Sequence, residues 1–174
     1  MQCASTTRSR LGCLSRAALG GLLWMLLAGA AGAHDANTAA VQGMQASAGE
    51  MPFGRPGDAE HVVRTVEIVM SDRMRFRPDS ITVKRGDTVR FKVANGGKLL
   101  HELVIGTAAD LKAHAAMMRQ HPDMHHEAPY MVHVPPGEGG EIVWQFTRAG
   151  DFAFACLVAG HFEAGMKGRI VVRK

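Results

Sequence analysis

Short apolar segments recur from residue 62 to the end of the chain, and clusters of turn-forming residues separate them. Several segments alternate apolar and polar residues, as in Val66-Glu67-Ile68 and Ile81-Thr82-Val83, which is the period of a half-buried β-strand. Because no helical patterns alternate with them, the segments predict an all-β protein, an antiparallel β-sandwich with Greek-key connections. The predicted strands cover residues 62–70, 80–84, 88–93, 99–105, 141–146, 151–156 and 168–172.

One stretch departs from this strand pattern. Thr107-Ala108-Ala109-Asp110 has the residue types of a helix capping box, and Leu111, Ala115 and Met118 follow at helical spacing until His121-Pro122. These features predict a short helix of about three turns, followed by an irregular loop to about Val132. Together they form an insertion, 107–133, between two strands. An insertion of this length is more often functional than structural, or else it is mobile.

Residues 1–33 have the pattern of a secretory signal peptide. Three arginines and no acidic residue precede an apolar stretch at 17–27, and small residues follow, ending in Ala31-Gly32-Ala33. The apolar stretch is shorter than the roughly 20 residues of a membrane span, so we expect cleavage near Ala33 and no membrane anchor. Cys13 precedes the apolar stretch, whereas a lipidated cysteine would follow it. The exported chain would then begin at His34 with a flexible leader, 34–60, and continue as one domain, 61–174.

The composition is that of an ordinary globular domain, with 174 residues of which 47% are hydrophobic and 21% charged. The formal net charge of +4 depends on the arginines of the predicted signal peptide, without which 17 basic and 16 acidic side chains remain. A nearly neutral chain with no basic run offers nucleic acid no electrostatic footprint. We therefore expect no nucleic-acid partner.

Cys156 is the only cysteine outside the predicted signal peptide, which contains Cys3 and Cys13. The exported chain therefore cannot form an intrachain disulfide. A single thiol in an oxidising compartment is open to oxidation unless something protects it. From the cysteine alone, two interpretations remain open: an inert buried thiol, or a thiolate that binds a metal.

A C-x4-H-x4-M spacing places Cys156, His161 and Met166 on one loop between two predicted strands. Thiolate and thioether are soft ligands that favour copper, and a His₂Cys set with a weak axial methionine is the arrangement of blue copper centres. Such a centre needs a second histidine, for which His101, at a strand end after the Asn95-Gly96-Gly97 turn, is the candidate. Taken singly, Met166 could be a core methionine and His101 a buried strand-end histidine. Zinc is a candidate only as an adventitious occupant.

These residues resemble the cupredoxins, the single-domain type 1 copper proteins that include plastocyanin, azurin and rusticyanin. The resemblance covers about residues 65–174, including the segments 77–83, 84–89 and 101–103 and the loop from Cys156 to Met166. It implies that His101, Cys156 and His161 are the equatorial ligands of one type 1 copper, with Met166 as the axial ligand. The spacing along the loop is more similar to that of rusticyanin than to that of plastocyanin.

The resemblance also implies a hydrophobic docking patch beside His161, with Leu157, Val158 and Phe162 as contributors. One residue departs from the family pattern. Many cupredoxins have Asn or Ser after the first histidine, where it supports the cysteine loop, but this chain has Glu102. The departure leaves the ligand assignment in place, but the colour and the reduction potential cannot be carried over from the family.

The insertion is dense in soft and borderline metal ligands. His114 with Met118, and Met117 with His121, are i, i+4 pairs that can meet on one face of a helix, an arrangement suited to Cu(I). We therefore predict an accessory copper site; the alternative is that Leu111 and Met118 pack on the sandwich while the histidines face solvent. The candidate accessory ligands are His114, Met117, Met118, His121, Met124, His125, His126, Met131 and His133. His34 would add an amino-terminal chelate, and His61 is expected at the surface.

Together these features predict a periplasmic type 1 copper protein with one-electron transfer capability that serves copper homeostasis or tolerance and is not an enzyme. The insertion makes the chain similar to the copper-tolerance cupredoxins of the CopI type, since a plain electron carrier would not need it. One alternative is a dedicated soluble electron carrier in a respiratory chain. Another is a small copper oxidase, which normally needs several coppers close together. The expected partners are copper ions and a redox protein that the sequence does not identify.

Overall fold

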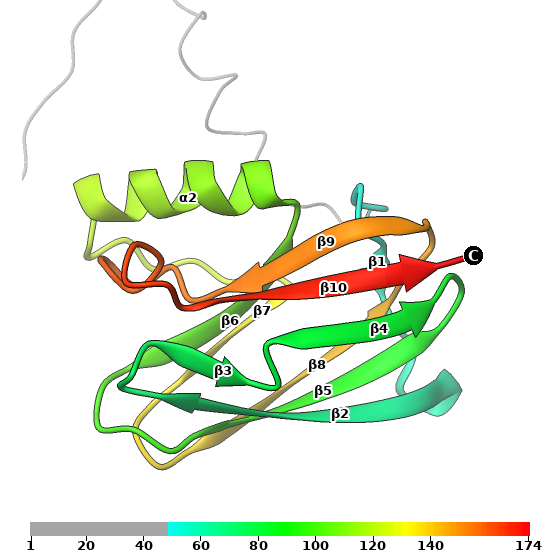
Figure 1. The fold of residues 1–174 in the computed structure, drawn as a ribbon, viewed down its shortest axis with the longest axis horizontal. Helices are drawn as coiled ribbons and strands as arrows, with labels where there is room; N and C mark the ends of the chain where they lie inside the picture. Colours follow the sequence, from blue (N-terminus) through cyan, green and yellow to red (C-terminus); the bar gives the residue numbers. More distant parts are fainter. Residues whose placement is uncertain (1–48) are drawn as a thin grey trace, which may run out of the picture. The chain divides into compact units, whose positions relative to one another are not determined.

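The computed structural model describes residues 49–174, in which ten strands form two five-stranded sheets (Figure 1). The first sheet has the strand order β1-β8-β5-β2-β3, and the second has the order β4-β10-β9-β6-β7. The first contains β1 (Arg55–Pro56), β2 (Val62–Ser71), β3 (Arg75–Arg77), β5 (Thr88–Asn95) and β8 (Gly139–Gln145). The second contains β4 (Ser80–Lys84), β6 (His101–Gly106), β7 (Met131–Val134), β9 (Gly150–Ala155) and β10 (Lys167–Arg173).

Every strand predicted from the sequence is present, with ends that differ by a few residues, and the two sheets confirm the β-sandwich. The prediction of antiparallel pairing is wrong for two pairs, because β2 pairs with β5 and β4 pairs with β10 in parallel. Parallel neighbours need a crossover connection. Alternation of apolar and polar residues shows which face of a strand is buried, but it does not show the direction of the neighbouring strand.

Aromatic and aliphatic side chains from alternate strand positions fill the space between the sheets. Trp144 of β8 is completely buried and stacks on Phe53, with ring centroids 5.3 Å apart. Phe76 of β3 meets Phe154 of β9 edge to face at 5.0 Å, across the two sheets. Burying a side chain of this size contributes about 1.5–3 kcal/mol to the free energy of unfolding. This packing therefore holds the two sheets at a fixed distance from each other.

The helix α2 (Ala108–Gln120) lies on the outer face of the second sheet, over β6 and β9 (Figure 1). Its cap is the predicted one, since the Asp110 N–H donates to the Thr107 hydroxyl at 3.1 Å. The helix buries Leu111, Ala115 and Met118 in a second apolar cluster, which also contains Val104, Met131, Ala155 and Leu157. Leu111 and Met118 therefore pack on the sandwich, as the alternative interpretation expected, but only part of its second half holds, because His114 is half-buried whereas His121 and His125 are exposed.

Strand β6 is buried on both faces because it lies between the two apolar clusters. Leu103 and Ile105 point into the core between the sheets, whereas Val104 points toward α2. The same alternation holds on β9, where Phe154 belongs to the first cluster and Ala155 to the second. Successive residues at the ends of these strands therefore face two different environments.

The predicted flexible leader is wrong for its described part. Residues from Met51 onward contribute β1, which pairs with β8, and a 3-10 helix, η1 (Ala59–His61). Phe53 is 2% exposed, and the Trp144 indole N–H donates to its carbonyl at 3.1 Å. One aromatic residue packing into the core orders this segment, although glycines and prolines surround it. The predicted signal peptide and His34 lie outside the described residues.

Two further strands were not predicted. β7 occupies Met131–Val134, where we expected the end of an irregular loop, and it pairs with β6. β3 is a strand of three residues next to β2. Both are short and lie at sheet edges, so they show too few alternating positions to be recognised.

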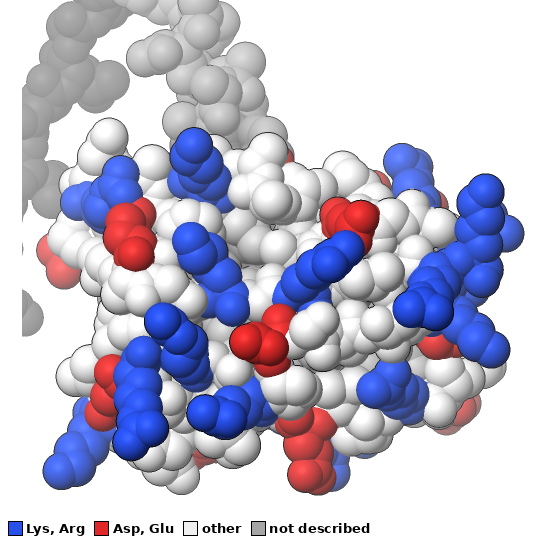
Figure 2. Space-filling model, in the orientation of Figure 1, with Lys and Arg blue, Asp and Glu red and all other residues white. Residues whose placement is uncertain are grey.

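Basic and acidic side chains are interspersed on the face shown in Figure 2, on which β3, β4 and β10 lie toward the viewer. Arg75 of β3, Lys84 of β4 and Arg169 of β10 are exposed basic residues. Arg169 pairs with Asp151 at 2.6 Å. In residues 49–174 no helix is long and apolar enough to cross a membrane.

Candidate metal centre

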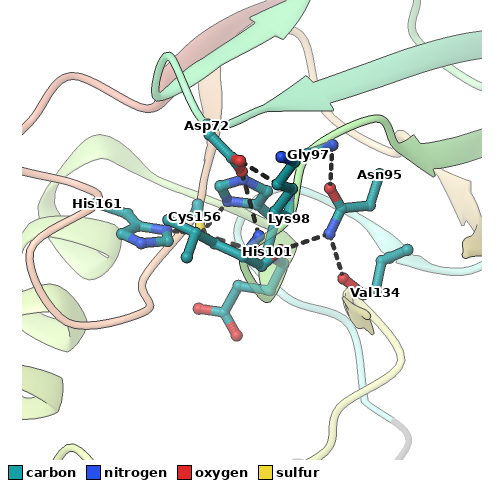
Figure 3. A network of polar contacts seen from close by, with 10 residues as sticks. Asp72, Asn95, Gly97, Lys98, His101, Val134, Cys156 and His161 are labelled. Carbon is teal, nitrogen blue, oxygen red and sulfur yellow. Dashed lines mark hydrogen bonds and ion pairs between the residues drawn. The ribbon is translucent and has the colours of Figure 1, made fainter. Parts of the chain in front are cut away.

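Three of the predicted copper ligands meet at one end of the second sheet. His101 is the first residue of β6, Cys156 directly follows β9, and the loop from β9 to β10 carries His161. These ends lie side by side because β6 and β9 are hydrogen-bonded antiparallel neighbours. The Cys156 sulfur is 3.3 Å from His161 Nδ1 and 4.0 Å from His101 Nδ1 (Figure 3). One ligand atom from each residue lies within 4.8 Å of the others.

Met166 ends the same loop and is completely buried in the apolar cluster that contains Cys156. The Cys156 N–H donates to the Met166 carbonyl at 3.1 Å, and the Met166 N–H donates to the His161 carbonyl at 3.0 Å. These two backbone hydrogen bonds close the loop. The closed loop therefore fixes the positions of Cys156, His161 and Met166 relative to one another.

Burial controls the protonation of these groups. It raises the pKa of the Cys156 thiol to about 12, so the thiol keeps its proton at neutral pH until a metal ion replaces it. Burial, together with the neighbouring His101, lowers the pKa of His161, so its ring is neutral at pH 7. A neutral imidazole can donate a nitrogen lone pair to a metal.

The donor set fits copper. A thiol, two imidazoles and a buried thioether are soft and borderline ligands, and a His₂Cys set with a methionine suits copper better than a hard cation. The Glu102 N–H also points at the Cys156 sulfur, at 3.4 Å, where it would stabilise negative charge on a thiolate.

A carboxylate on the neighbouring loop orients His101. Its ring Nε2 donates to Asp72 Oδ1 at 3.1 Å, which leaves Nδ1 facing Cys156 (Figure 3). Asp72 also accepts the backbone N–H groups of Lys98 at 2.7 Å and Leu99 at 3.3 Å. The hydrogen bond from Lys98 is the largest of the effects that lower the pKa of Asp72. The charged carboxylate thus fixes both the ring orientation and the tautomer of His101.

Asn95 holds the turn before His101. Its side-chain amide donates to the carbonyls of Leu99 and Val134, each at 2.8 Å, and its side-chain oxygen accepts the Gly97 N–H at 2.9 Å (Figure 3). Asn95 is 3% exposed. The polar atoms of its side chain therefore hold the turn together and tie it to β7.

Replacing Asp72 with asparagine is expected to weaken Cu(II) binding by about 10- to 100-fold, because a neutral amide supports the basicity of His101 less well. The same change is expected to raise the reduction potential, since Cu(II) loses more stabilisation than Cu(I). Competition titration with a chelator measures the first effect and voltammetry the second. Asp79→Asn, which removes an exposed carboxylate, is the control. Equal affinities for the two variants would contradict the role of Asp72.

Replacing Gly165 with alanine is expected to lower the free energy of unfolding by about 1–3 kcal/mol, because its φ of +97° is strained for any residue with a side chain. The added Cβ would also lie 2.9 Å from Arg75 Nη1, which donates to the Ala164 carbonyl at 3.1 Å. Urea unfolding of the metal-free protein measures the loss.

Gly137→Ala is the matched control, because Gly137 has a φ of +76° in open space. It should cost similar stability but leave the visible spectrum of the copper-loaded protein unchanged. Gly165→Ala should change that spectrum, because residue 165 directly precedes Met166. Identical spectra for the two variants would show that the loop tolerates the change.

Three histidines of the insertion lie close together: His114 on α2, His126 on the following loop and His133 on β7. His114 of α2 and His126 have ring centroids 4.5 Å apart, and the His133 ring lies 6.5 Å from that of His126. Three ring nitrogens, His114 Nε2 and both nitrogens of His126, are buried without a hydrogen-bond partner among the described residues. Each of these two neutral rings can therefore offer one nitrogen lone pair to a cation.

The remaining residues of the predicted accessory site lie elsewhere. Met118 and Met131 are buried in the second apolar cluster, and Met117 packs against that cluster. His121 ends the helix and is exposed, and Met124 and His125 are exposed on the following loop. His61, expected at the surface, is exposed and pairs with Asp58.

The implied docking patch needs a correction at one residue. Leu157 is 1% exposed and packs under α2, so it cannot contribute to a surface. Val158 and Phe162 are half-buried. Leu99 and Leu100, which were not predicted, are 46% and 41% exposed on the turn before His101.

Sequence reasoning missed Asp72 and the contacts of Glu102. Asp72 lies in a turn after β2, far from His101 in the sequence, and no spacing connects the two. Glu102 was noticed as a departure from the family pattern, but its partners come from β7 and from the residue after Cys156. Strand register brings Glu102 to its partners, and neighbouring turns bring Asp72 to His101; the sequence pattern shows neither.

Comparison with known proteins identifies the family. Residues 63–173 match the family model of copper binding proteins of the plastocyanin/azurin family. The copper-resistant cuproprotein CopI of Rubrivivax gelatinosus is 59% identical over 140 residues, covering 80% of this chain and 84% of that protein. The protein of the same name from Pseudomonas aeruginosa is 35% identical over 150 residues, covering 70% of this chain and 82% of its own length.

A solved structure of auracyanin B has the same fold, with a TM-score of 0.58 and 21% sequence identity, over 70% of this chain and 97% of that one. The family model covers most of the described residues and includes His101, Cys156, His161 and Met166. The chain therefore belongs to the plastocyanin/azurin family of copper-binding proteins, as a cupredoxin of the CopI type.

Proposed function

We propose that this protein holds one type 1 copper through His101, Cys156, His161 and Met166 and uses it to transfer single electrons. When bound, copper supplies the chemistry by alternating between Cu(I) and Cu(II). The observation that carries the proposal is the meeting of a buried thiol with two imidazole nitrogens, 3.3 and 4.0 Å from its sulfur.

The protein's part in electron transfer is to keep these donors in place. Asp72 orients His101, two backbone hydrogen bonds close the loop from Cys156 to Met166, and the Glu102 N–H points at the sulfur. Packing between the sheets holds both strand ends. Because the donors are fixed before a metal binds, little rearrangement is needed between the two oxidation states, which favours fast transfer.

A second copper, as Cu(I), is proposed at His114, His126 and His133. A buried nitrogen without a hydrogen bond costs about 1–3 kcal/mol, and a cation at the cluster would satisfy such nitrogens on His114 and His126. Burial, together with the neighbouring His126, lowers the pKa of His114, so this ring is neutral and available at pH 7.

Copper tolerance in the periplasm is the proposed physiological role. Two relatives carry the name copper-resistant cuproprotein, and the insertion adds copper-binding groups that a plain electron carrier does not need. The predicted signal peptide, cleaved near Ala33, would deliver the chain to the periplasm. The protein acts in this proposal by binding copper and passing electrons, and no catalytic reaction is assigned to it.

The test is growth on copper of a copper-sensitive bacterium that expresses the full chain. We expect the wild-type protein to restore growth, Cys156→Ser to abolish the effect, and His114→Ala with His126→Ala to reduce it. His121→Ala with His125→Ala, which removes two exposed imidazoles of the same insertion, is the matched control. Equal growth with all four proteins would contradict a role in tolerance. That result would favour the alternative function, a dedicated electron carrier, for which voltammetry should show a reversible one-electron couple.

A further inference from the structure

The two proposed copper sites lie on opposite faces of the same sheet, one residue apart along two strands. On β6, His101 is part of the type 1 site, whereas the side chain of the next residue, Glu102, contacts His133 of the three-histidine cluster. After β9, Cys156 packs in the core between the sheets, whereas Leu157 packs in the cluster under α2. Because successive strand residues point to opposite faces, each residue of the type 1 site is followed in the chain by a residue that faces the other site.

Glu102 connects the two faces through its side chain. The carboxylate is 97% buried, with Oε1 accepting the Leu157 N–H at 2.7 Å and Oε2 accepting His133 Nε2 at 2.8 Å. Strand register explains the second contact, because Glu102 lies directly opposite His133 in the β6–β7 pair. The Glu102 N–H points at the Cys156 sulfur at 3.4 Å. One residue therefore contacts the type 1 loop twice and the histidine cluster once.

A buried carboxylate needs a partner, and His133 is that partner. The hydrogen bond to Glu102 raises the pKa of His133, as expected for an Nε2–H that donates to a carboxylate. Because Nε2 is committed to Glu102, Nδ1 is the nitrogen that His133 can offer to a cation. A carboxylate that accepts a hydrogen bond from a metal-binding histidine interacts electrostatically with the bound ion through that ring.

We propose that Glu102 is a positioning residue shared by both sites, through which a cation bound at His114, His126 and His133 changes the reduction potential and the spectrum of the type 1 copper. This inference rests on the proposed function. A cation on His133 draws the Glu102 charge toward the cluster and away from the Leu157 N–H. The loop next to Cys156 then loses negative potential, which favours the reduced, less positive state of the type 1 site.

Thermodynamic linkage makes the effect reciprocal. If a cation at the cluster raises the type 1 potential, reduction of the type 1 site must tighten cation binding at the cluster by the same factor. Coupling between sites is typically fivefold or more, and a tenfold ratio corresponds to about 59 mV for a one-electron couple. The protein would therefore hold accessory copper more tightly when its type 1 site is reduced.

Zinc is the probe for the experiment, because it has no redox chemistry, binds imidazoles and does not displace Cu(II) from a site that copper prefers. The protein loaded with one Cu(II) is titrated with zinc while bound copper and zinc, the visible spectrum and the type 1 potential are recorded. We expect one zinc per chain at the cluster, a higher potential and a shifted thiolate-to-copper band. His114→Ala with His126→Ala should remove both the zinc and the shift.

Glu102→Gln tests whether the shifts depend on the Glu102 carboxylate or come directly from the charge of the zinc ion. It keeps the size of the side chain and an acceptor for the Leu157 N–H, but removes the charge, so the zinc-induced shifts in potential and band position should fall well below those of the wild type. Glu127→Gln is the matched control, since Glu127 is an exposed carboxylate whose charge also acts on His133. It should leave the shifts intact.

His133→Gln provides a second variant if Glu102→Gln fails to hold copper. The glutamine amide can still donate to Glu102, but the ring that carries the cation is gone, so zinc bound to the remaining pair should leave the type 1 potential unchanged. Full zinc occupancy without any shift in the wild type, or equal shifts in the wild type and Glu102→Gln, would overturn the inference alone. Absence of zinc at the cluster would overturn the accessory site and the inference with it.

Discussion

Replacing Cys156 with serine is expected to abolish the intense thiolate-to-copper absorption of the Cu(II)-loaded protein completely. The band requires a sulfur ligand, and Cys156 is the only cysteine among the described residues. The fold should survive, because a serine hydroxyl can accept the Glu102 N–H that now points at the sulfur. Visible absorption at one Cu(II) per chain, with circular dichroism as a check on folding, measures the effect.

The control for this variant is His61→Ala, which removes an exposed imidazole far along the chain from the loop. It should keep the band at full intensity. A band that persisted in folded Cys156→Ser would show that the sulfur is not a copper ligand.

Replacing both His114 and His126 with alanine is expected to lower the Cu(I) bound by the reduced protein from two per chain to one. These residues carry three buried ring nitrogens that have no hydrogen-bond partner among the described residues, so their loss removes the accessory site. The Cu(II) band should keep its intensity, because His101, Cys156 and His161 are untouched. Titration with a Cu(I) chelator under reductant measures the stoichiometry.

Replacing both His121 and His125 with alanine is the matched control, since these imidazoles belong to the same insertion but are exposed. It should retain two Cu(I) per chain. Loss of the second Cu(I) in this control, with retention in the His114 and His126 variant, would move the accessory site to the exposed loop.

Periodicity made much of this architecture predictable. The strands follow the alternation of apolar and polar residues, and α2 follows the capping box at Thr107 and the helical spacing of Leu111, Ala115 and Met118. The loop from Cys156 to Met166 is predictable because three metal-binding residue types occur on one short segment. His101 was found because a strand end after a glycine-rich turn is where a second ligand can reach that loop.

The missed features depend on pairing between distant segments. Asp72 reaches His101 only because the turn after β2 lies beside the turn before β6. His133 lies against Glu102 because β7 pairs with β6 in one particular register, and β7 itself is too short to recognise.

Within the insertion, residue type alone does not separate ligands from core residues. Met118 and Met131 are buried in an apolar cluster, whereas His114 and His126 lie where their nitrogens find no partner among the described residues. Packing of α2 on the sheet makes this distinction.

Titration of the metal-free protein with Cu(II), followed by visible absorption, tests the central claim most directly. We predict an intense thiolate-to-copper band that grows linearly and saturates at one Cu(II) per chain. The Cys156 proton should be released as the metal binds, because burial raises the pKa of that thiol to about 12. Stoichiometric binding of Cu(II) without such a band would contradict the type 1 site formed by His101, Cys156, His161 and Met166.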